Sequence, residues 1–150
     1  MRVLASLLAV LALAGCGSSG SKPHGTTLYE AGDWSVRLDG TTATAYHRVD
    51  GEWRAVHGRG VAIAILGPKR GQKASATPQV AVELTSTRRL VESGLWVDGQ
   101  ELLVKGGGLT TSRTTIYGAP AAPLAPGRHT AVAYGRTDTT AAAVAWTFRV

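Results

Sequence analysis

The chain has a single cysteine, Cys16, which rules out an intramolecular disulfide and a Cys-x-x-Cys metal or redox motif. The His-Glu-x-x-His zinc motif and the Gly-x-Ser-x-Gly nucleophile elbow are also missing. None of the 4 histidines stands two or four residues from another, the spacings that place ligands on one strand or helix face. We therefore predict no catalytic residue, no metal site and no cofactor.

Long runs of one charge are absent as well. The chain carries 16 Lys and Arg against 10 Asp and Glu, a formal net charge of +6, and no block of five like charges occurs. A basic balance favours anionic surroundings such as membrane headgroups or acidic polymers. Because the excess is modest and scattered, it predicts a solvated surface, and we expect no nucleic-acid partner.

The amino-terminal residues form the most specific motif. Met1 and Arg2 precede an apolar run, Val3–Leu13, that is too short to span a bilayer and is typical of a signal peptide. Leu13-Ala14-Gly15-Cys16 follows and resembles the bacterial lipobox. The resemblance implies that residues 1–15 are removed and that the sulfur of Cys16 is acylated. The alternative is an ordinary secreted protein, cleaved nearby, with a free thiol.

If the lipobox is used, the lipid bilayer is the first partner of the mature chain. Two acyl chains give stable anchoring, whereas one chain is marginal. We expect a lipid-anchored protein on the extracytoplasmic face of the cell membrane, or in the outer membrane of a Gram-negative host. Residues 16–27 are mostly small and polar, which predicts a short flexible tether.

The remainder, residues 28–150, has no convincing helical period. Short alternating segments separated by turn signals predict an all-β antiparallel sandwich. Residues 28–60 are expected to form a three-stranded meander, with Asp39-Gly40 and Asp50-Gly51 as two-residue turns, because this pair suits positive φ. The predicted facing pairs are Leu38 with Thr41, Val49 with Glu52, Arg48 with Trp53, and Tyr46 with Ala55.

Residues 61–150 are expected to form the core of the sandwich. The apolar run 61–66, bounded by glycines, predicts a buried strand, and Asp98-Gly99 predicts a third hairpin. At the carboxyl end, Trp146 and Phe148 alternate with polar or small residues, so both rings should face a covering sheet. The segment Arg128–Arg136 should be the hairpin partner of this closing strand.

Four segments of this region together resemble bacterial immunoglobulin-like domains: Pro78-Gln-Val-Ala-Val-Glu-Leu, Leu95-Trp-Val-Asp-Gly, Leu124-Ala-Pro-Gly-Arg-His and Ala145-Trp-Thr-Phe-Arg-Val. The resemblance implies an immunoglobulin-like sandwich, with His129 at the position of the tyrosine corner. Aligned through His129, Ala131 and Ala133 would face inward. The opposite phase would bury Val132 and Tyr134, and the sequence leaves this choice open.

The same region is more weakly similar to the copper-carrier sandwich family, which implies an alternative function as an extracytoplasmic copper carrier. That family holds copper with histidines near the mature amino terminus and before the last strand. The turn Asp138-Thr-Thr140 has no histidine, so the metal site does not carry over. His47 and His57 are placed to approach across the second hairpin, but two ligands make a weak site.

One constellation remains as a candidate binding patch. Tyr46, Arg48 and Trp53 are predicted to share one face of the meander, and aromatics interleaved with cations hold sugars or polyanions by stacking and charge. The alternative is that this face packs on the sandwich, with Arg48 and Trp53 as a cross-strand pair. The function that we expect is a non-catalytic binding or structural module of the cell envelope, contacting protein or wall polymer.

Overall fold

The computed structural model describes residues 23–108 and 112–150. The predicted signal peptide, Cys16 and the tether as far as residue 22 lie outside these residues. In the described part every regular element is a β-strand. No helix in this part is long and apolar enough to cross a membrane.

The strands form three antiparallel sheets of four strands each. The meander sheet has the order β1 (Thr26–Ala31), β2 (Trp34–Asp39), β3 (Thr42–Val49), β4 (Glu52–Val56). The outer sheet has the order β5 (Val61–Gly67), β6 (Val80–Ser86), β10 (Arg113–Gly118), β9 (Lys105–Gly106). The central sheet has the order β12 (Ala141–Arg149), β11 (Arg128–Arg136), β7 (Glu92–Val97), β8 (Gln100–Glu101). The prediction of an all-β antiparallel sandwich is confirmed.

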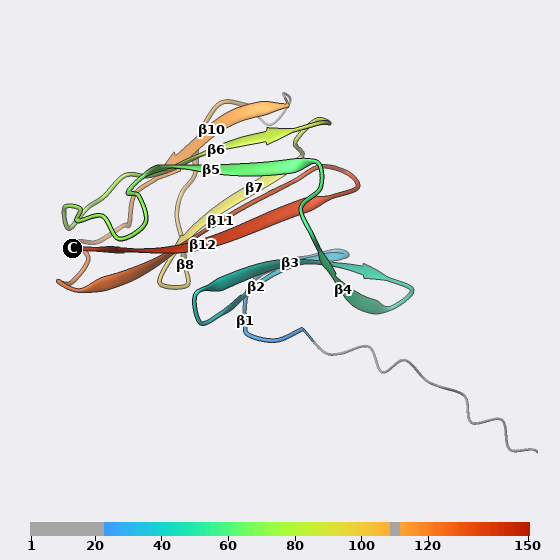
Figure 1. Cartoon of the computed structure of the whole chain (residues 1–150), viewed down its shortest axis with the longest axis horizontal. Helices are drawn as coiled ribbons and strands as arrows, with labels where there is room; N and C mark the ends of the chain where they lie inside the picture. The colour runs from blue at the N-terminus through green and yellow to red at the C-terminus, as the bar shows by residue number, and fades with distance from the viewer. Residues whose placement is uncertain (1–22, 109–111) are drawn as a thin grey trace, which may run out of the picture.

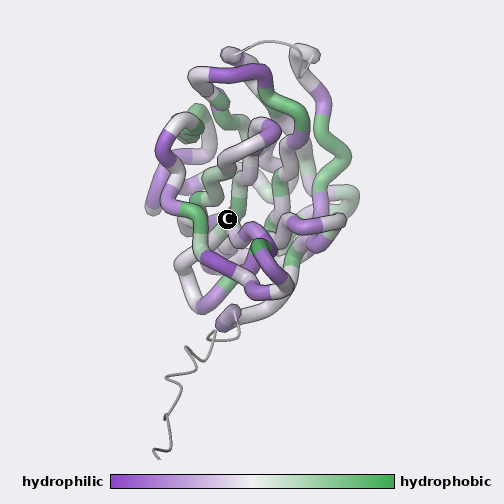
Figure 2. Tube along the Cα trace, turned by 90° about the vertical axis from the view of Figure 1, so that its right-hand side faces the viewer, coloured by the Kyte–Doolittle hydropathy of each residue, from purple (hydrophilic) through white to green (hydrophobic). Residues whose placement is uncertain are grey.

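The three sheets stack as layers, and the central sheet is covered on both faces (Figure 1). Its first face and the outer sheet enclose the main core, which includes Leu84, Leu95, Ile116, Trp146 and Phe148. Its second face packs against the meander sheet through a second core: Trp34, Val36, Ala45, Trp96, Val132, Tyr134, Ala141 and Ala145. In Figure 2, most hydrophilic stretches lie at the periphery of the body, as expected when apolar side chains fill the cores.

This layering decides the facing of β11. Ala131 and Ala133 belong to the main core, while Val132 and Tyr134 belong to the second, and none of the four is more than 1% exposed. Both phases are therefore buried, with methyl groups on one side and large side chains on the other. The register against β12 and β7 runs without a shift, so no bulge is needed.

The closing strand β12 behaves as predicted. Trp146 and Phe148 are 1% and 0% exposed within the main core. The indole Nε1 of Trp146 donates a hydrogen bond of 2.8 Å to the carbonyl of Pro68, which satisfies its one buried polar atom. On the other face of the strand, Ala145 packs against the meander sheet.

The prediction of a buried strand over residues 61–66 is wrong in one respect. β5 is the edge strand of the outer sheet, and only one of its faces is covered. Ala62, Ala64 and Leu66 are exposed, the last by 45%. A continuous apolar run indicates burial of both faces, but alanine is small enough to lie exposed at little cost.

The first hairpin also differs from its predicted register. Leu38 pairs with Ala43 instead of Thr41, because the loop is Gly40-Thr41 and Asp39 stays in β2. Gly40 takes the positive φ, at 57°, that the first loop position requires. Since the shift is by two residues, every side chain keeps its predicted face.

The second and third hairpins follow the prediction. Asp50 and Gly51 have φ of 54° and 81°, and Asp98 and Gly99 have 50° and 80°. Arg48 pairs with Trp53, as predicted for a two-residue loop. The meander sheet nevertheless has four strands and not three, because β1 begins at Thr26, inside the predicted tether, and pairs with β2.

Candidate binding surface

The free face of the meander sheet carries the predicted patch. Side chains alternate across a strand, and Trp34, Val36 and Ala45 point into the second core. The residues between them therefore point away from the sandwich. Tyr46, Arg48 and Trp53 lie on this free face, Tyr46 and Trp53 half-buried and Arg48 exposed. We call these three residues the meander patch.

Arg48 is the centre of the patch. Its guanidinium carbon lies 5.2 Å from the centroid of the Trp53 ring, within cation–π range. Its Nε lies 3.2 Å from Oδ1 of Asp33, and its Nη2 donates to the carbonyl of Gly32 at 3.3 Å. The side chains of Arg48 and Asp33 are 42% and 61% exposed, so this pair contributes little stability and can give way to a competing anion.

A second row of polar atoms lies beside the patch. Ser35 pairs with Tyr46 in the register, and its buried Oγ has no hydrogen-bond partner among the described residues. The same holds for Nε of Arg37, whose Nη1 donates to the carbonyl of Pro23 at 3.2 Å. Buried polar atoms without partners are uncommon in folded proteins. These two atoms are buried beneath the free face, so they are not exposed to a ligand on it.

The alternative in which this face packs on the sandwich is wrong, because the opposite face of the meander sheet does so. The other half of that alternative holds, since Arg48 and Trp53 do form a stacked cross-strand pair. The prediction that the three residues share one face is confirmed. The parity of β3 and β4 was sufficient to find this face.

No protein-family model and no curated protein matches the sequence.

The two histidines considered for metal binding do not face each other. His47 is opposite Arg54 in the register, and its ring stacks on the indole of Trp34 with centroids 4.1 Å apart. His57 follows the end of β4 and is exposed. Over residues 23–108 and 112–150, no three or more His, Cys, Asp or Glu side chains gather in a group able to hold a metal ion.

His129 forms the corner predicted for it. Its Nε2 lies 2.7 Å from the carbonyl oxygen of Ala125, and its Nδ1 lies 2.6 Å from Oδ2 of Asp98. Both partners are acceptors, so both ring nitrogens carry protons when both bonds form. The bonds to Asp98 and Ala125 raise the pKa of His129. This histidine has a structural role in fastening the third hairpin to the start of β11.

A polar cluster fastens the meander sheet to the sandwich. Glu92 accepts a hydrogen bond from the hydroxyl of Tyr29 and one of 2.5 Å from Nε of Arg136. The guanidinium carbon of Arg136 lies 5.4 Å from the centroid of the Trp34 ring. Burial, with the bond to Glu92, raises the pKa of Tyr29 to about 12. Sequence analysis missed this cluster because its members are far apart in the chain.

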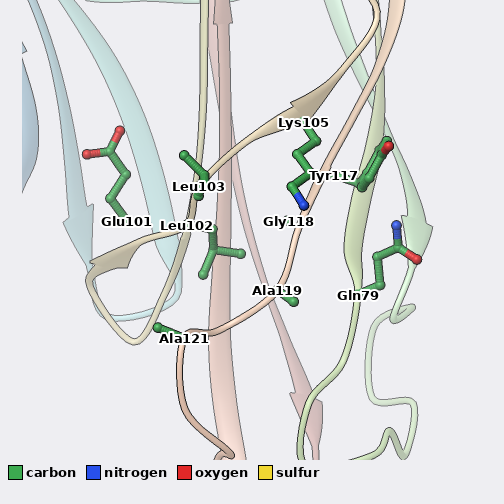
Figure 3. A pocket seen from close by; sticks show the side chains of 9 residues that line it. All are labelled: Gln79, Glu101, Leu102, Leu103, Lys105, Tyr117, Gly118, Ala119 and Ala121. Carbon is green, nitrogen blue, oxygen red and sulfur yellow. The ribbon is translucent and has the colours of Figure 1, made fainter.

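A separate apolar groove lies at the edge where the chain crosses from the central to the outer sheet. Its volume is about 490 Å³, and Figure 3 shows its lining side chains. The crossing segment supplies Leu102, Leu103 and Lys105, and the opposite wall contains Tyr117, Gly118 and Ala119. Leu103 is 79% exposed, more than any other large hydrophobic residue described. Sequence analysis did not single out this groove, because its walls come from distant segments.

Proposed function

We propose that this protein is a lipid-anchored, non-catalytic module of the bacterial cell envelope that binds an anionic wall polymer through the meander patch. The observation that carries the proposal is the stacked pair of Arg48 and Trp53 on a sheet face directed away from the sandwich. An indole offers a flat apolar surface to a sugar ring, and an adjacent guanidinium attracts phosphate or carboxylate groups.

The surroundings of the patch support an anionic ligand. His57 and Arg59 are exposed just after β4, the strand that carries Trp53, whereas Arg54 faces the other side of the sheet with its register partner His47. Without Arg2, which is lost with the signal peptide, the mature chain keeps a formal net charge of +5, and this attracts polyanions in a way that salt weakens.

The anchor and the body complete the proposal. The lipobox places Cys16 close to the membrane, with the meander sheet as the first folded part after the tether. We propose that the outer and central sheets form an immunoglobulin-like sandwich. Their orders, β5-β6-β10-β9 and β12-β11-β7-β8, correspond to the immunoglobulin orders ABED and GFC with one added strand. The corner at His129 supports the same assignment.

Binding to purified wall material tests the function. The full chain, extracted in detergent, is mixed with the insoluble wall fraction of its host at low salt, and the bound fraction is measured. Trp53→Ala is expected to weaken binding about tenfold, the order of effect of losing one aromatic stacking platform. Arg48→Gln should weaken it several-fold and reduce its salt dependence.

Arg89→Gln is the matched control, because it removes an equal charge from the exposed loop between β6 and β7, which is not part of the meander sheet. Equal retention of all variants would refute the assignment of the patch. Retention that is sensitive to Trp53 but unaffected by salt would identify a neutral glycan instead of a polyanion. Retention of a surface protein with no polymer bound would favour a protein partner.

The anchor is tested independently. Cys16→Ser should release the protein from the membrane fraction and abolish its labelling by radioactive palmitate. A wild-type chain that takes up no palmitate label would remove the lipoprotein assignment without affecting the patch.

A further inference from the structure

The tether joins the fold on the face that carries the meander patch. Arg37 points to this free face, because Val36 and Leu38 on either side of it pack toward the second core. Its Nη1 donates a hydrogen bond of 3.2 Å to the carbonyl of Pro23, the first described residue. Figure 1 agrees, since the blue start of the described chain lies on the side of the meander sheet away from the other two sheets.

The backbone fixes this point of entry. Gly25 has a φ of 89°, and a Cβ on it would overlap the carbonyl oxygen of Leu38. From Thr26 onward the chain is paired with β2, and Thr26 lies opposite Leu38 in the register. The described chain therefore begins at a fixed place, on the free side of the meander sheet.

The length of the tether limits how far the patch can lie from the membrane. Pro23 is the seventh residue after Cys16, a length that spans about 25 Å when fully extended and about 15 Å on average as a flexible chain. Arg48 lies four residues along β3 from Thr44, the register partner of Arg37, which adds about 13 Å. Even with the length of the Arg37 side chain added, the patch of a chain acylated at Cys16 stays within roughly 50 Å of the lipid headgroups.

The free face is poorly suited to binding the bilayer itself. Oε2 of Glu30 lies 3.8 Å from Nη2 of Arg37, and Asp33 offsets the charge of Arg48 in the same way. An anionic headgroup layer attracts a basic surface by about 1 kcal/mol for each lysine or arginine, and acids beside the bases cancel most of this attraction. The pair of Arg48 and Trp53 instead offers one cation and one ring, which fits a single anionic group next to a sugar or polyol.

We propose that the meander patch binds a polyanion that is itself linked to a membrane lipid and that carries phosphate or carboxylate groups along a chain of sugars or polyols. This inference rests on the proposed function, because it needs both the anchor at Cys16 and a patch that binds an anionic polymer. The patch recognises the repeating unit of the polymer, and the short tether selects the lipid-linked form. Two partners rooted in one membrane meet at a high effective concentration, which raises the apparent affinity without any new contact.

Energy transfer to the membrane tests on which side of the molecule the bilayer lies. The acylated full chain is placed in phosphatidylcholine vesicles in which some headgroups carry an acceptor dye. Because the sulfur of Cys16 is acylated, a cysteine introduced elsewhere is the only free thiol and takes a donor dye. Ala55→Cys places the donor on the free face, opposite Tyr46, and the matched control Ala64→Cys places it on the exposed side of the outer sheet.

The two donor positions are separated by two sheet spacings, about 20 Å. We expect energy transfer from position 55 to be about twofold more efficient than from position 64. Equal transfer, or weaker transfer from position 55, would overturn the proposal. A chain that is not acylated at Cys16 would remove this inference together with the anchor.

A comparison of two forms of one polymer tests the partner. The lipid-linked anionic polymer of the host is placed in the same vesicles as the acylated chain, or is added in solution after its lipid has been removed, and the fluorescence of a dye at position 55 reports binding. The polymer concentration for half-saturation should be about tenfold lower for the lipid-linked form, and this preference should vanish in detergent. Trp53→Ala should weaken the binding of both forms about tenfold, whereas Arg89→Gln should leave it unchanged.

The outcomes separate this inference from the proposed function. Equal half-saturation by both forms in vesicles, with binding that still depends on Trp53, would overturn the inference alone. A signal that depends on Trp53 in vesicles without polymer would identify lipid headgroups as the ligand and would also overturn it. If neither form binds in vesicles or in detergent, the inference and the assignment of the patch fail together.

Discussion

The corner at His129 makes a sharp prediction about stability and pH. His129 is 8% exposed, and its two ring nitrogens face the carboxylate of Asp98 and the carbonyl of Ala125. Only the imidazolium donates to both at once, so folding favours the charged ring and raises its pKa. A neutral ring leaves one nitrogen lone pair facing an acceptor.

The direction of the pH dependence follows from this shift. A folded-state pKa above the unfolded value means that the folded protein holds the proton more tightly. The stabilisation is therefore complete below about 6.5, the ordinary pKa of histidine, and is lost as the pH rises through the raised pKa. A hydrogen bond to a charged group contributes about 1.5–3 kcal/mol. Because the side chain of Asp98 is 47% exposed, solvent screening lowers this contribution, and we expect about 1–2 kcal/mol.

The assay compares the wild type with His129→Gln by urea denaturation between pH 5.5 and pH 9, followed by tryptophan fluorescence. The difference in free energy of unfolding should be largest at the acid end and fall by about 1 kcal/mol toward the alkaline end. The difference between the two free energies of unfolding removes the contribution of groups that titrate equally in both proteins. Asp98→Asn keeps an acceptor for the backbone N–H of Thr130 but removes the larger cause of the raised pKa of His129, so it should reduce this slope. A difference that is constant, or that grows with pH, would refute the reasoning.

Two further predictions concern the contact between the meander sheet and the sandwich. Gly94→Ala should lower the free energy of unfolding by about 1–3 kcal/mol in the same urea assay, because an added Cβ would lie 2.8 Å from Cζ3 of the buried Trp96. A loss below about 0.5 kcal/mol would show that the indole can move aside. Glu92→Ala should lower the free energy of unfolding by about 2 kcal/mol, because it leaves the half-buried Arg136 without its carboxylate partner. Asp138→Asn, which breaks an exposed ion pair, should lower it by less than about 0.5 kcal/mol. Equal losses would contradict a role for Glu92 in holding the meander sheet on the sandwich.

Local patterns were sufficient for most of the strands and for the face of the candidate patch. Asp-Gly pairs fixed two hairpins, since few other residues accept positive φ at both loop positions. Once the second hairpin was fixed, strand parity placed Arg48 and Trp53 on the same face. At Asp39-Gly40 the same reasoning gave the wrong register. The turn begins one residue later, at Gly40, and the threonines that follow are compatible with either register.

What the sequence could not show was which surfaces meet. The groove beside Leu103 and the cluster around Glu92 are built by segments distant in the chain, and no local period records such contacts. The strand β11 illustrates the same limit. Alternating hydrophobicity shows which side of a strand faces the core only when the other side is exposed to solvent, and both sides of β11 are buried.

The double burial of the central sheet also bears on the candidate surface. In a two-layer sandwich, one face of each sheet meets water, and Trp96 and Tyr134 would form an exposed aromatic surface there. Here the meander sheet covers that surface with Trp34 and Val36, which fixes the orientation of its opposite face. The meander patch is therefore carried on a sheet whose other side is locked into a core. A ligand held there would meet pre-positioned rings and would lose little affinity to ordering the site.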